Sequence, residues 1–588
     1  MTHPRRRPRT GRLVAGLVTA SLATLALTAT AASGTPRSAA SVPTGDGVWS
    51  AAGVAAAGSS EADCQWAMYG QNLARTFSHE CETAISTTSV ATLVPAWFFQ
   101  TGFSVTASPA VVGGQVFVGD WSGTMHALDA GDGTELWSVQ TEEAPGAPFG
   151  PIVSSAAVAD VVMGGEAGAR RLVIFGSGPR MYALDATDGS EVWVQYFGAD
   201  IVDEQIEFES SPVVHDGVVY IGMDVHNRTL DQTGGVRGGV FALDAATGET
   251  LWYFNPEWDD ERSGCSSVWS SPTLNVGAGL VYGATGNCPH DVDEWTPYIE
   301  SIFALDMATG DPVWSYTPSP LNHDDYDFGA TANLFRDAGG RQVVGIGKKD
   351  GNYYALDPLT GELFWTTNVQ TPFRPQDDFS VGGFIGSTAI WDGNVFGGTA
   401  IGSPPYYHSL EARTGAVRPW AGVAGPAYGA SAAAGGVVFA ANLDNTIKAF
   451  DPATGAILWT SELSGPSSSG PAIVGDSLYV GAGTSASDLC AKDTPVFSDL
   501  CFALFDDVLG SLGGVHAYRL ATSSDDGSPP PSATDPEPEP EPGTEVQPGS
   551  QDAPAPDADP SDAPLPATGG SLAAASLLLA AAVRLRRH

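Results

Sequence analysis

The sequence predicts an all-β fold, an eight-bladed β-propeller, from three observations made along residues 62–522. First, a short phrase of the form Ala-Leu-Asp recurs, and most copies continue into a Gly-containing turn. Second, short runs rich in β-branched and aromatic residues lie between the turns, which is typical of antiparallel meanders. Third, eight Trp residues mark the repeats, at Trp97, Trp137, Trp193, Trp252, Trp314, Trp365, Trp420 and Trp459.

Each repeat predicts a blade of four strands. In the first repeat, strand-like runs occupy 108–112, 116–119 and 124–129, and Gly-containing turns separate them. Four strands repeated eight times close radially and leave only short edges. A parallel solenoid is the alternative, but its repeats are shorter. We expect the eight repeat Trp side chains to pack between neighbouring blades and to have no chemical role.

The charge of the chain excludes one class of function. Its 588 residues contain 26 Lys and Arg against 67 Asp and Glu, a formal net charge of −41. Phosphate recognition requires a basic face, so nucleic acid is excluded as a partner. Only four Lys occur, and two of them are adjacent, Lys348 and Lys349.

The N-terminal residues predict export. Residues 1–32 have an Arg-rich start, an apolar stretch and an A-x-A pattern, which together indicate a secretory signal peptide. Residues 33–61 are rich in small residues and are interpreted as a linker.

The C-terminal residues predict a surface anchor. Residues 523–564 are acidic, Pro-rich and free of basic residues, so we expect a disordered, extended spacer. In 565–588, Leu565-Pro566-Ala567-Thr568-Gly569 precedes an apolar run and an Arg cluster. This arrangement resembles the LPxTG sortase signal of Gram-positive surface proteins. The resemblance implies that Thr568 is joined to peptidoglycan, so that the mature protein is wall-anchored outside the cell and retains no membrane span.

The six Cys fall in three pairs that are close in sequence. In an exported chain this pattern predicts three local disulfides, although other pairings remain open. No C-x-x-C occurs, which argues against a structural zinc site, and no C-x-x-C-H occurs, which excludes covalent c-type haem. The expected pairs are Cys64 with Cys81, Cys265 with Cys288, and Cys490 with Cys501.

From about Cys64 to Leu520 the repeat resembles the tryptophan-docking motif of quinoprotein dehydrogenases, the pyrroloquinoline quinone (PQQ) alcohol dehydrogenase family. The segment Trp66-Ala67-Met68-Tyr69-Gly70 belongs to the same resemblance. Part of the chain also resembles polyvinyl-alcohol dehydrogenases of this group. The resemblance implies an eight-bladed propeller that oxidises an alcohol with PQQ and commonly with calcium.

Four residues match the family's site in order. Trp269 stands where the family stacks an indole against PQQ, and Asn287 where an amide oxygen coordinates calcium. Asp327 falls on the catalytic carboxylate, which accepts the alcohol proton. Lys349 aligns with the basic residue that polarises the quinone oxygens. Each of the first three has a structural alternative: Trp269 as core packing, Asn287 as a turn cap, and Asp327 in an acidic surface loop.

Two departures from the family pattern weaken the resemblance. The family's adjacent Cys pair, a lid over the quinone, would fall near Ser154-Ser155. The family's calcium-binding Glu aligns with Thr233, so calcium is doubtful. Candidates that could replace this Glu are Glu209, Asp224 and Asp231.

Two hypotheses of function follow. The first is an extracellular quinoprotein dehydrogenase, which lacks haem and therefore needs a separate electron acceptor. Its substrate is an alcohol of open identity, whether short, polymeric or sugar-like. The second is a non-catalytic propeller that serves as a surface binding or adhesion scaffold.

Overall fold

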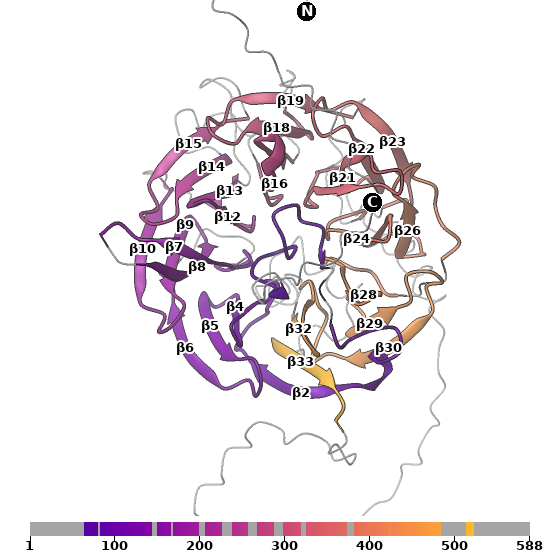
Figure 1. Ribbon diagram of the computed structural model, residues 1–588, viewed down its shortest axis with the longest axis horizontal. Helices are drawn as coiled ribbons and strands as arrows, with labels where there is room; N and C mark the ends of the chain where they lie inside the picture. Colours follow the sequence, from indigo (N-terminus) through magenta and orange to yellow (C-terminus); the bar gives the residue numbers. More distant parts are fainter. Residues whose placement is uncertain are drawn as a thin grey trace, which may run out of the picture. The chain divides into compact units, whose positions relative to one another are not determined.

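The protein forms a closed ring of antiparallel sheets around a central axis (Figure 1). The computed structural model describes residues 64–522, all within one compact unit, and its described helices are two short 3-10 turns, η2 (Val90–Thr92) and η3 (Val276–Ala278). The positions left out of this range are 80, 82, 144–149, 166–167, 199–205, 226–237, 257–266, 287–297, 319–324, 373–381, 401, 421, 423 and 484–512.

Eight sheets make up the ring, which confirms the predicted fold. Blade one comprises β3 (Ala110–Val112), β4 (Gln115–Gly119), β5 (Thr124–Asp129) and β6 (Glu135–Gln140). Blade two comprises β7 (Ala157–Val162), β8 (Ala169–Ser177), β9 (Arg180–Asp185) and β10 (Glu191–Tyr196). Blade three comprises β12 (Val213–His215), β13 (Val218–Val225), β14 (Gly239–Asp244) and β15 (Thr250–Phe254), and β11 (Ile206–Glu207) also pairs with β13. Blade four comprises β16 (Thr273–Asn275), β17 (Leu280–Ala284), β18 (Ile302–Asp306) and β19 (Pro312–Tyr316).

The second half of the ring repeats this order. Blade five comprises β20 (Asn333–Arg336), β21 (Gln342–Gly347), β22 (Asn352–Leu356) and β23 (Leu363–Asn368). Blade six comprises β24 (Ala389–Trp391), β25 (Asn394–Gly398) and β26 (Tyr407–Glu411). Blade seven comprises β27 (Ala432–Ala434), β28 (Val437–Ala441), β29 (Thr446–Phe450) and β30 (Ile457–Glu462), and β1 (Ser78–His79) joins β27 in parallel. Blade eight comprises β31 (Ala472–Val474), β32 (Ser477–Ala482), β33 (Gly514–Leu520) and β2 (Leu93–Gln100).

Blade six differs from the prediction of four strands. Its described part contains three, followed by an isolated bridge between Leu410 and Val417. Pro419 stands directly before the repeat Trp420 and has no N–H to give to a fourth strand. Trp420 nevertheless keeps its docking contact, because its Nε1–H donates to the carbonyl of Asp451 in blade seven at 3.2 Å.

Blade eight joins the two ends of the propeller. Its outermost strand, β2, comes from the N-terminal side of the chain, and its other three strands come from the C-terminal side. The pairing of β2 with β33 runs from Leu93 opposite Leu520 to Gln100 opposite Gly514. The ring therefore closes by hydrogen bonds between segments at opposite ends of the described chain.

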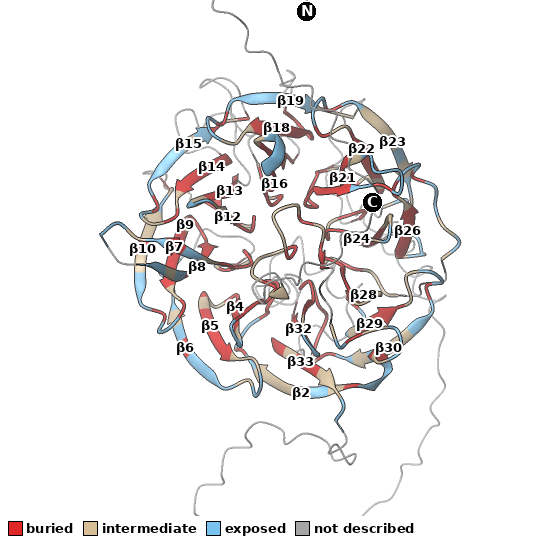
Figure 2. Ribbon diagram, viewed as in Figure 1, coloured by how far each residue is buried: buried red, intermediate tan, exposed pale blue. Residues whose placement is uncertain are grey.

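The eight repeat Trp side chains hold neighbouring blades together, as predicted. Each indole Nε1–H donates to a backbone carbonyl of the next blade at 3.0–3.2 Å. Figure 2 shows the inner strands buried and much of the outermost layer exposed or half-buried. The accepting carbonyls belong to Ala130, Ala186, Ala245, Met307, Pro358, Ala412, Asp451 and Leu93.

A second circle of hydrogen bonds lies near the axis, at the start of the innermost strands. In five consecutive steps, a backbone N–H of one blade donates to a Ser or Thr hydroxyl of the next at 2.8–3.3 Å. Gly470 of blade eight donates to the Ser108 hydroxyl at 2.9 Å and so returns to blade one. Ser431 of blade seven instead donates its N–H to the backbone carbonyl of Ser387 at 2.9 Å. We call this set the hydroxyl ring; the residues at its eight positions are Ser108, Ser155, Ser211, Ser271, Thr331, Ser387, Ser431 and Gly470.

The segment from Trp66 to His79 crosses the axis and contacts every blade (Figure 1). Its backbone carbonyls accept hydrogen bonds from residues placed two or three positions after the hydroxyl ring. Blade three is reached by the buried Arg75 guanidinium, which donates to the carbonyls of Ser211 and Pro212 at 2.9 and 3.0 Å. The backbone partners in the other blades are Val111, Val158, Leu274, Leu334, Ile390 and Ala433, and His79 Nε2 bonds the carbonyl of Ile473.

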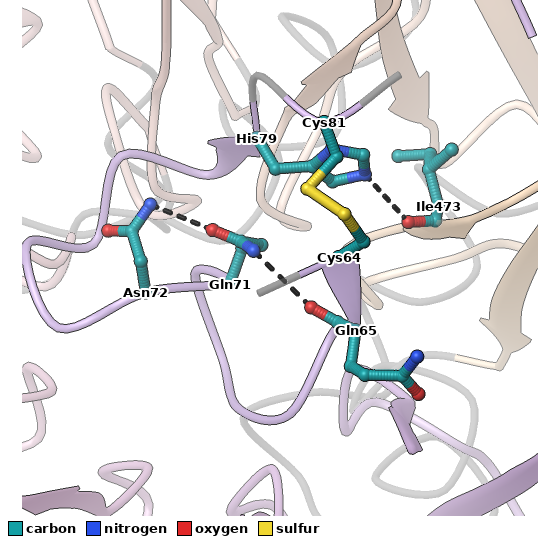
Figure 3. The surroundings of a disulfide bond; sticks show 7 residues. All are labelled: Cys64, Gln65, Gln71, Asn72, His79, Cys81 and Ile473. Atoms are coloured by element: carbon teal, nitrogen blue, oxygen red, sulfur yellow. Dashed lines mark hydrogen bonds between the residues drawn. A yellow bond between two sulfur atoms is a disulfide. The ribbon is translucent and has the colours of Figure 1, made fainter. Parts of the chain in front are cut away.

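A disulfide joins the two residues that flank this crossing segment (Figure 3). It links Cys64 to Cys81, which confirms the first predicted pair. Beside it, Gln71 Nε2 donates to the carbonyl of Gln65 at 3.3 Å. The other two predicted pairs involve Cys265, Cys288, Cys490 and Cys501, which lie outside the described residues.

The predicted targeting and anchoring segments also lie outside the described residues. These are the signal peptide at 1–32, the linker at 33–61, the spacer at 523–564 and the sortase-type signal at 565–588 with Thr568. Within the described ranges, no helix has the length and apolar character needed to cross a membrane.

Candidate functional site

Trp269 lies just before the hydroxyl ring in blade four, and its indole packs against blade five. The contact is at Gly329, where an added Cβ would fall 1.7 Å from the indole Cη2. Trp269 is half-buried. The innermost strands of a propeller run in one direction along the axis. Trp269 precedes the hydroxyl ring and the crossing segment binds after it, so they lie on opposite sides of the ring.

Lys349 lies over the same indole and binds two carboxylates. Its ammonium Nζ is 5.5 Å from the centre of the Trp269 ring. It donates to Oδ2 of Asp327 at 2.9 Å and to both carboxylate oxygens of Asp325 at 3.1 Å. All three of these charged side chains are buried. Three of the residues singled out in the sequence, Trp269, Asp327 and Lys349, are therefore brought together.

The backbone fixes this arrangement. Lys349 donates its N–H to the carbonyl of Asp327 at 3.0 Å, so the two residues are joined by main chain as well as by side chain. Burial opposes the charge of Lys349, but the carboxylates of Asp325 and Asp327 outweigh it and raise the pKa of the ammonium. Lys349 is therefore a permanent cation in the neutral range.

Lys348 points to a different carboxylate. Its Nζ donates to Oε2 of Glu300 at 2.8 Å, and both residues are buried. Burial raises the pKa of Glu300 to about 7, although Lys348 opposes this shift. The two adjacent lysines thus bind different acidic groups, and Asp350 lies a further 3.9 Å from Lys348 Nζ.

Two site residues escaped the sequence reasoning, Asp325 and Glu300. They bind Lys349 and Lys348 across 24 and 48 positions of sequence. The adjacent Lys pair was the available signal, since buried ammonium groups need carboxylate partners, but it does not say which acids supply them.

Other predicted site residues are only partly described. Asn287, Thr233 and Asp231 lie outside the described residues. Asp224 is buried on β13 and accepts a hydrogen bond from the Ser267 hydroxyl. Glu209 is half-buried, two positions before Ser211 of the hydroxyl ring.

The position expected for a Cys pair has another role here. Ser155 belongs to the hydroxyl ring, accepting from the Ser108 N–H at 2.8 Å and donating its own N–H to Ser211 Oγ at 3.0 Å. The side chain of Ser154 is fully buried. Ser155 therefore contributes to closure of the ring near the axis.

Comparison with known proteins agrees with this geometry. Residues 66–378 match the family model described as glucose/ethanol/alcohol dehydrogenase, beta-propeller domain. Residues 349–494 match a second model, described as outer membrane protein assembly factor BamB.

Curated relatives include two polyvinylalcohol dehydrogenases. That of Sphingopyxis sp. (strain 113P3) is 27% identical over 469 residues, covering 66% of this chain and 68% of the relative. That of Pseudomonas sp. is 28% identical over 419 residues and covers 62% of each. The quinohemoprotein alcohol dehydrogenase of Comamonas testosteroni is 29% identical over 327 residues, covering 48% of this chain and 44% of the relative.

Solved structures share the fold. A europium-containing methanol dehydrogenase superposes with a TM-score of 0.62 at 20% identity, covering 78% of this chain and 98% of that one. The Comamonas testosteroni enzyme superposes with a TM-score of 0.59, also at 20% identity, covering 78% and 80%. With its ring of docked tryptophans and a family match that spans residues 66–378, the chain belongs to the glucose/ethanol/alcohol dehydrogenase family of β-propeller proteins.

Proposed function

We propose that this chain is a quinoprotein dehydrogenase that oxidises an alcohol with PQQ. The observation that carries the proposal is the convergence of a half-buried indole, an ammonium group and a buried carboxylate, which belong to Trp269, Lys349 and Asp327. Membership of an alcohol dehydrogenase family supports the same activity.

The described residues fit a planar quinone. Trp269 offers a flat apolar surface, and Gly329 leaves the space that this indole occupies. Lys349 supplies a cation beside that surface, suited to polarising a quinone oxygen. Trp269 and Lys349 would therefore hold the cofactor, which supplies a two-electron oxidant that takes the hydride of the alcohol carbon.

The described residues do not assemble a metal site. Within the described ranges, no three His, Cys, Asp or Glu side chains are grouped so that they could hold a metal ion. The Asp327 carboxylate is instead bound by the Lys349 ammonium.

Asp327 is the residue we assign to proton transfer. The alcohol hydroxyl must lose its proton as the carbon loses hydride, and a carboxylate near the reacting carbon can accept it. An added Cβ at Gly286 would lie 3.1 Å from Oδ1 of Asp327, so a larger residue there would crowd the carboxylate.

The proposal extends to location and partners. The resemblance of residues 565–588 to a sortase signal supports a protein joined to peptidoglycan through Thr568, outside a Gram-positive cell. A separate electron acceptor would reoxidise the cofactor.

Polyvinyl alcohol and short alcohols are the first substrates to test, because the relatives include polyvinylalcohol dehydrogenases and a methanol dehydrogenase shares the fold.

Calorimetric titration of PQQ into the full mature chain tests the activity. We expect binding that Trp269→Ala weakens, and a dye-linked alcohol oxidation that Asp327→Asn abolishes while PQQ still binds. Lys448→Met is the matched control, because Lys448 is a buried lysine bound to Asp444 at 2.9 Å in blade seven. A folded wild-type chain that binds no PQQ would overturn the proposal in favour of a surface binding scaffold.

Fractionation of a Gram-positive host tests the location. The full chain is expected in the cell-wall fraction, and a chain lacking 565–588 in the medium. Equal release of both forms would contradict a sortase anchor.

A further inference from the structure

Glu300 lies between two blades, next to the proposed site but outside the group that would touch cofactor or alcohol. It directly precedes blade four's β18 region, whereas its ion-pair partner Lys348 follows β21 of blade five. Glu300 is 2% exposed and Lys348 is 3% exposed. Burying two charged groups costs desolvation free energy, so the presence of this ion pair between the blades needs a physical reason.

Contacts through Glu300 form a closed circuit that begins and ends at Asp327. In one direction, Gly286 leaves no room for a side chain beside Asp327, since an added Cβ would lie 3.1 Å from Oδ1, and the Gly286 carbonyl accepts the Glu300 N–H at 3.0 Å. In the other direction, the Glu300 carboxylate binds Lys348, and the next residue, Lys349, binds Asp327 through both backbone and side chain. Glu300 therefore belongs to both series of contacts, the one through Gly286 and the one through Lys348.

Lys348 also contacts the residue that follows Asp327. Its Nζ lies 5.3 Å from the centre of the Phe328 ring, which is fully buried. The Lys348 carbonyl accepts hydrogen bonds from Gly351 and Phe384, both at 3.0 Å. A shift of Lys348 would therefore move the chain on both sides of Asp327 and Lys349.

The backbone of Glu300 is itself unusual. Its φ is +42°, in the left-handed region that residues other than Gly rarely adopt. Such conformations persist where surrounding contacts hold them, and they gather at functional sites. The strain places the Glu300 N–H on Gly286 and its carboxylate on Lys348 at the same time.

From this circuit we infer that Glu300 is a positioning residue of the dehydrogenase site. By holding Lys348 it fixes the Lys348–Lys349 peptide, so that the Lys349 ammonium stays on Asp327 and over Trp269. This inference rests on the proposed function, and it assigns Glu300 no contact with alcohol or cofactor.

The charges around Glu300 predict that the turnover rate depends on pH. Burial raises the pKa of Glu300 to about 7; Lys348 opposes the shift, while Asp327 and Asp350 add to it. The Tyr354 hydroxyl also belongs to this group, since it donates to Asp350 at 2.9 Å and interacts electrostatically with Glu300. Below neutral pH, protonated Glu300 would hold Lys348 less firmly and leave it attracted to Asp350, 3.9 Å from its Nζ, so the turnover rate should fall on the acid side.

The test compares wild type with Glu300→Gln, using PQQ titration, kcat, KM and the pH profile of the full mature chain. We expect PQQ to bind both proteins, and kcat to fall at least about tenfold in the variant, as small misplacements of catalytic groups do. KM should change much less, and the acid-side fall near pH 7 should disappear. Lys448→Met, which breaks a lysine ion pair in blade seven, should leave all four measurements at the wild-type values.

A double variant separates positioning from stability. Glu300→Leu with Lys348→Met replaces the buried pair by apolar groups of similar size, a change that proteins often tolerate. If the double variant is as thermally stable as wild type but has a low kcat, the inference is supported. If the double variant matches wild type in both stability and kcat, or if Glu300→Gln has the wild-type kcat and pH profile, the inference is overturned. A wild-type chain that binds no PQQ would instead overturn the proposed function.

Discussion

Trp269 and Gly329 form the tightest interblade fit near the proposed site. The indole of blade four occupies the volume that a side chain at Gly329 of blade five would fill. The glycine thus sets how close Trp269 approaches blade five, and consequently how its indole is oriented.

Gly329→Ala should displace the indole and weaken PQQ binding by about tenfold or more, since an overpacked buried contact forces side chains off their rotamers. Calorimetry on the full chain measures the loss. Gly164→Ala is the matched control, because an added Cβ at Gly164 meets no atom within 4 Å. Unchanged binding in Gly329→Ala would show that the indole orientation does not matter for the cofactor.

Lys349→Met should destabilise the propeller as well as inactivate it. The substitution leaves the buried carboxylates of Asp325 and Asp327 without their ammonium partner. Breaking a buried ion pair on one side costs about 3 to 5 kcal/mol. Denaturant unfolding measures the cost, and adding Asp325→Asn should recover part of it because one carboxylate is then removed. A single variant as stable as wild type would contradict this account.

His126 predicts a pH-dependent contribution to stability. Burial disfavours its charged form, but hydrogen bonds to Asp120 and Glu135 outweigh burial and raise the pKa. The folded pKa lies above the unfolded one, so the stabilisation is fully present below about pH 6.5 and is lost as the pH rises through the folded pKa. The free-energy difference between wild type and His126→Gln should therefore be larger at pH 5.5 than at pH 8.5.

His408 predicts the opposite pH dependence of stability. Burial lowers its pKa to about 4. Wild type should therefore lose stability relative to His408→Gln as the pH falls from about 6.5 toward 4. A stability difference that does not change with pH for either variant would contradict the assignment of that histidine.

Reduction of the crossing segment's disulfide should lower stability without removing any blade. Cys64 and Cys81 enclose a loop with a sequence separation of 17, for which chain entropy predicts about 3 kcal/mol. Unfolding of Cys64→Ser/Cys81→Ser measures the change. An unaltered melting temperature would mean that contacts with the eight blades hold the segment alone.

The sequence was most informative where one residue type repeats in register. The eight Trp positions predicted the blades because each indole has the same neighbours in every repeat. The hydroxyl ring was missed although Ser-Pro recurs at Ser108, Ser211 and Ser271, since serine before a strand has many other uses.

The site was recovered less completely because its contacts join distant loops. Lys349 was identified, but its partner Asp325 and the pairing of Lys348 with Glu300 depend on how blades four and five meet. Blade six lost its predicted fourth strand to Pro419, a local effect that a repeat pattern conceals.

The pairing of β2 with β33 determines when the propeller can finish folding. Synthesis from the N-terminus produces β2 long before β33, and until then Leu93–Gln100 has no sheet to complete. Contacts across such sequence distances form slowly. The propeller therefore stays open until its last strand has been made, and a chain cut short before Gly514 would present an unpaired edge to aggregation and to proteases.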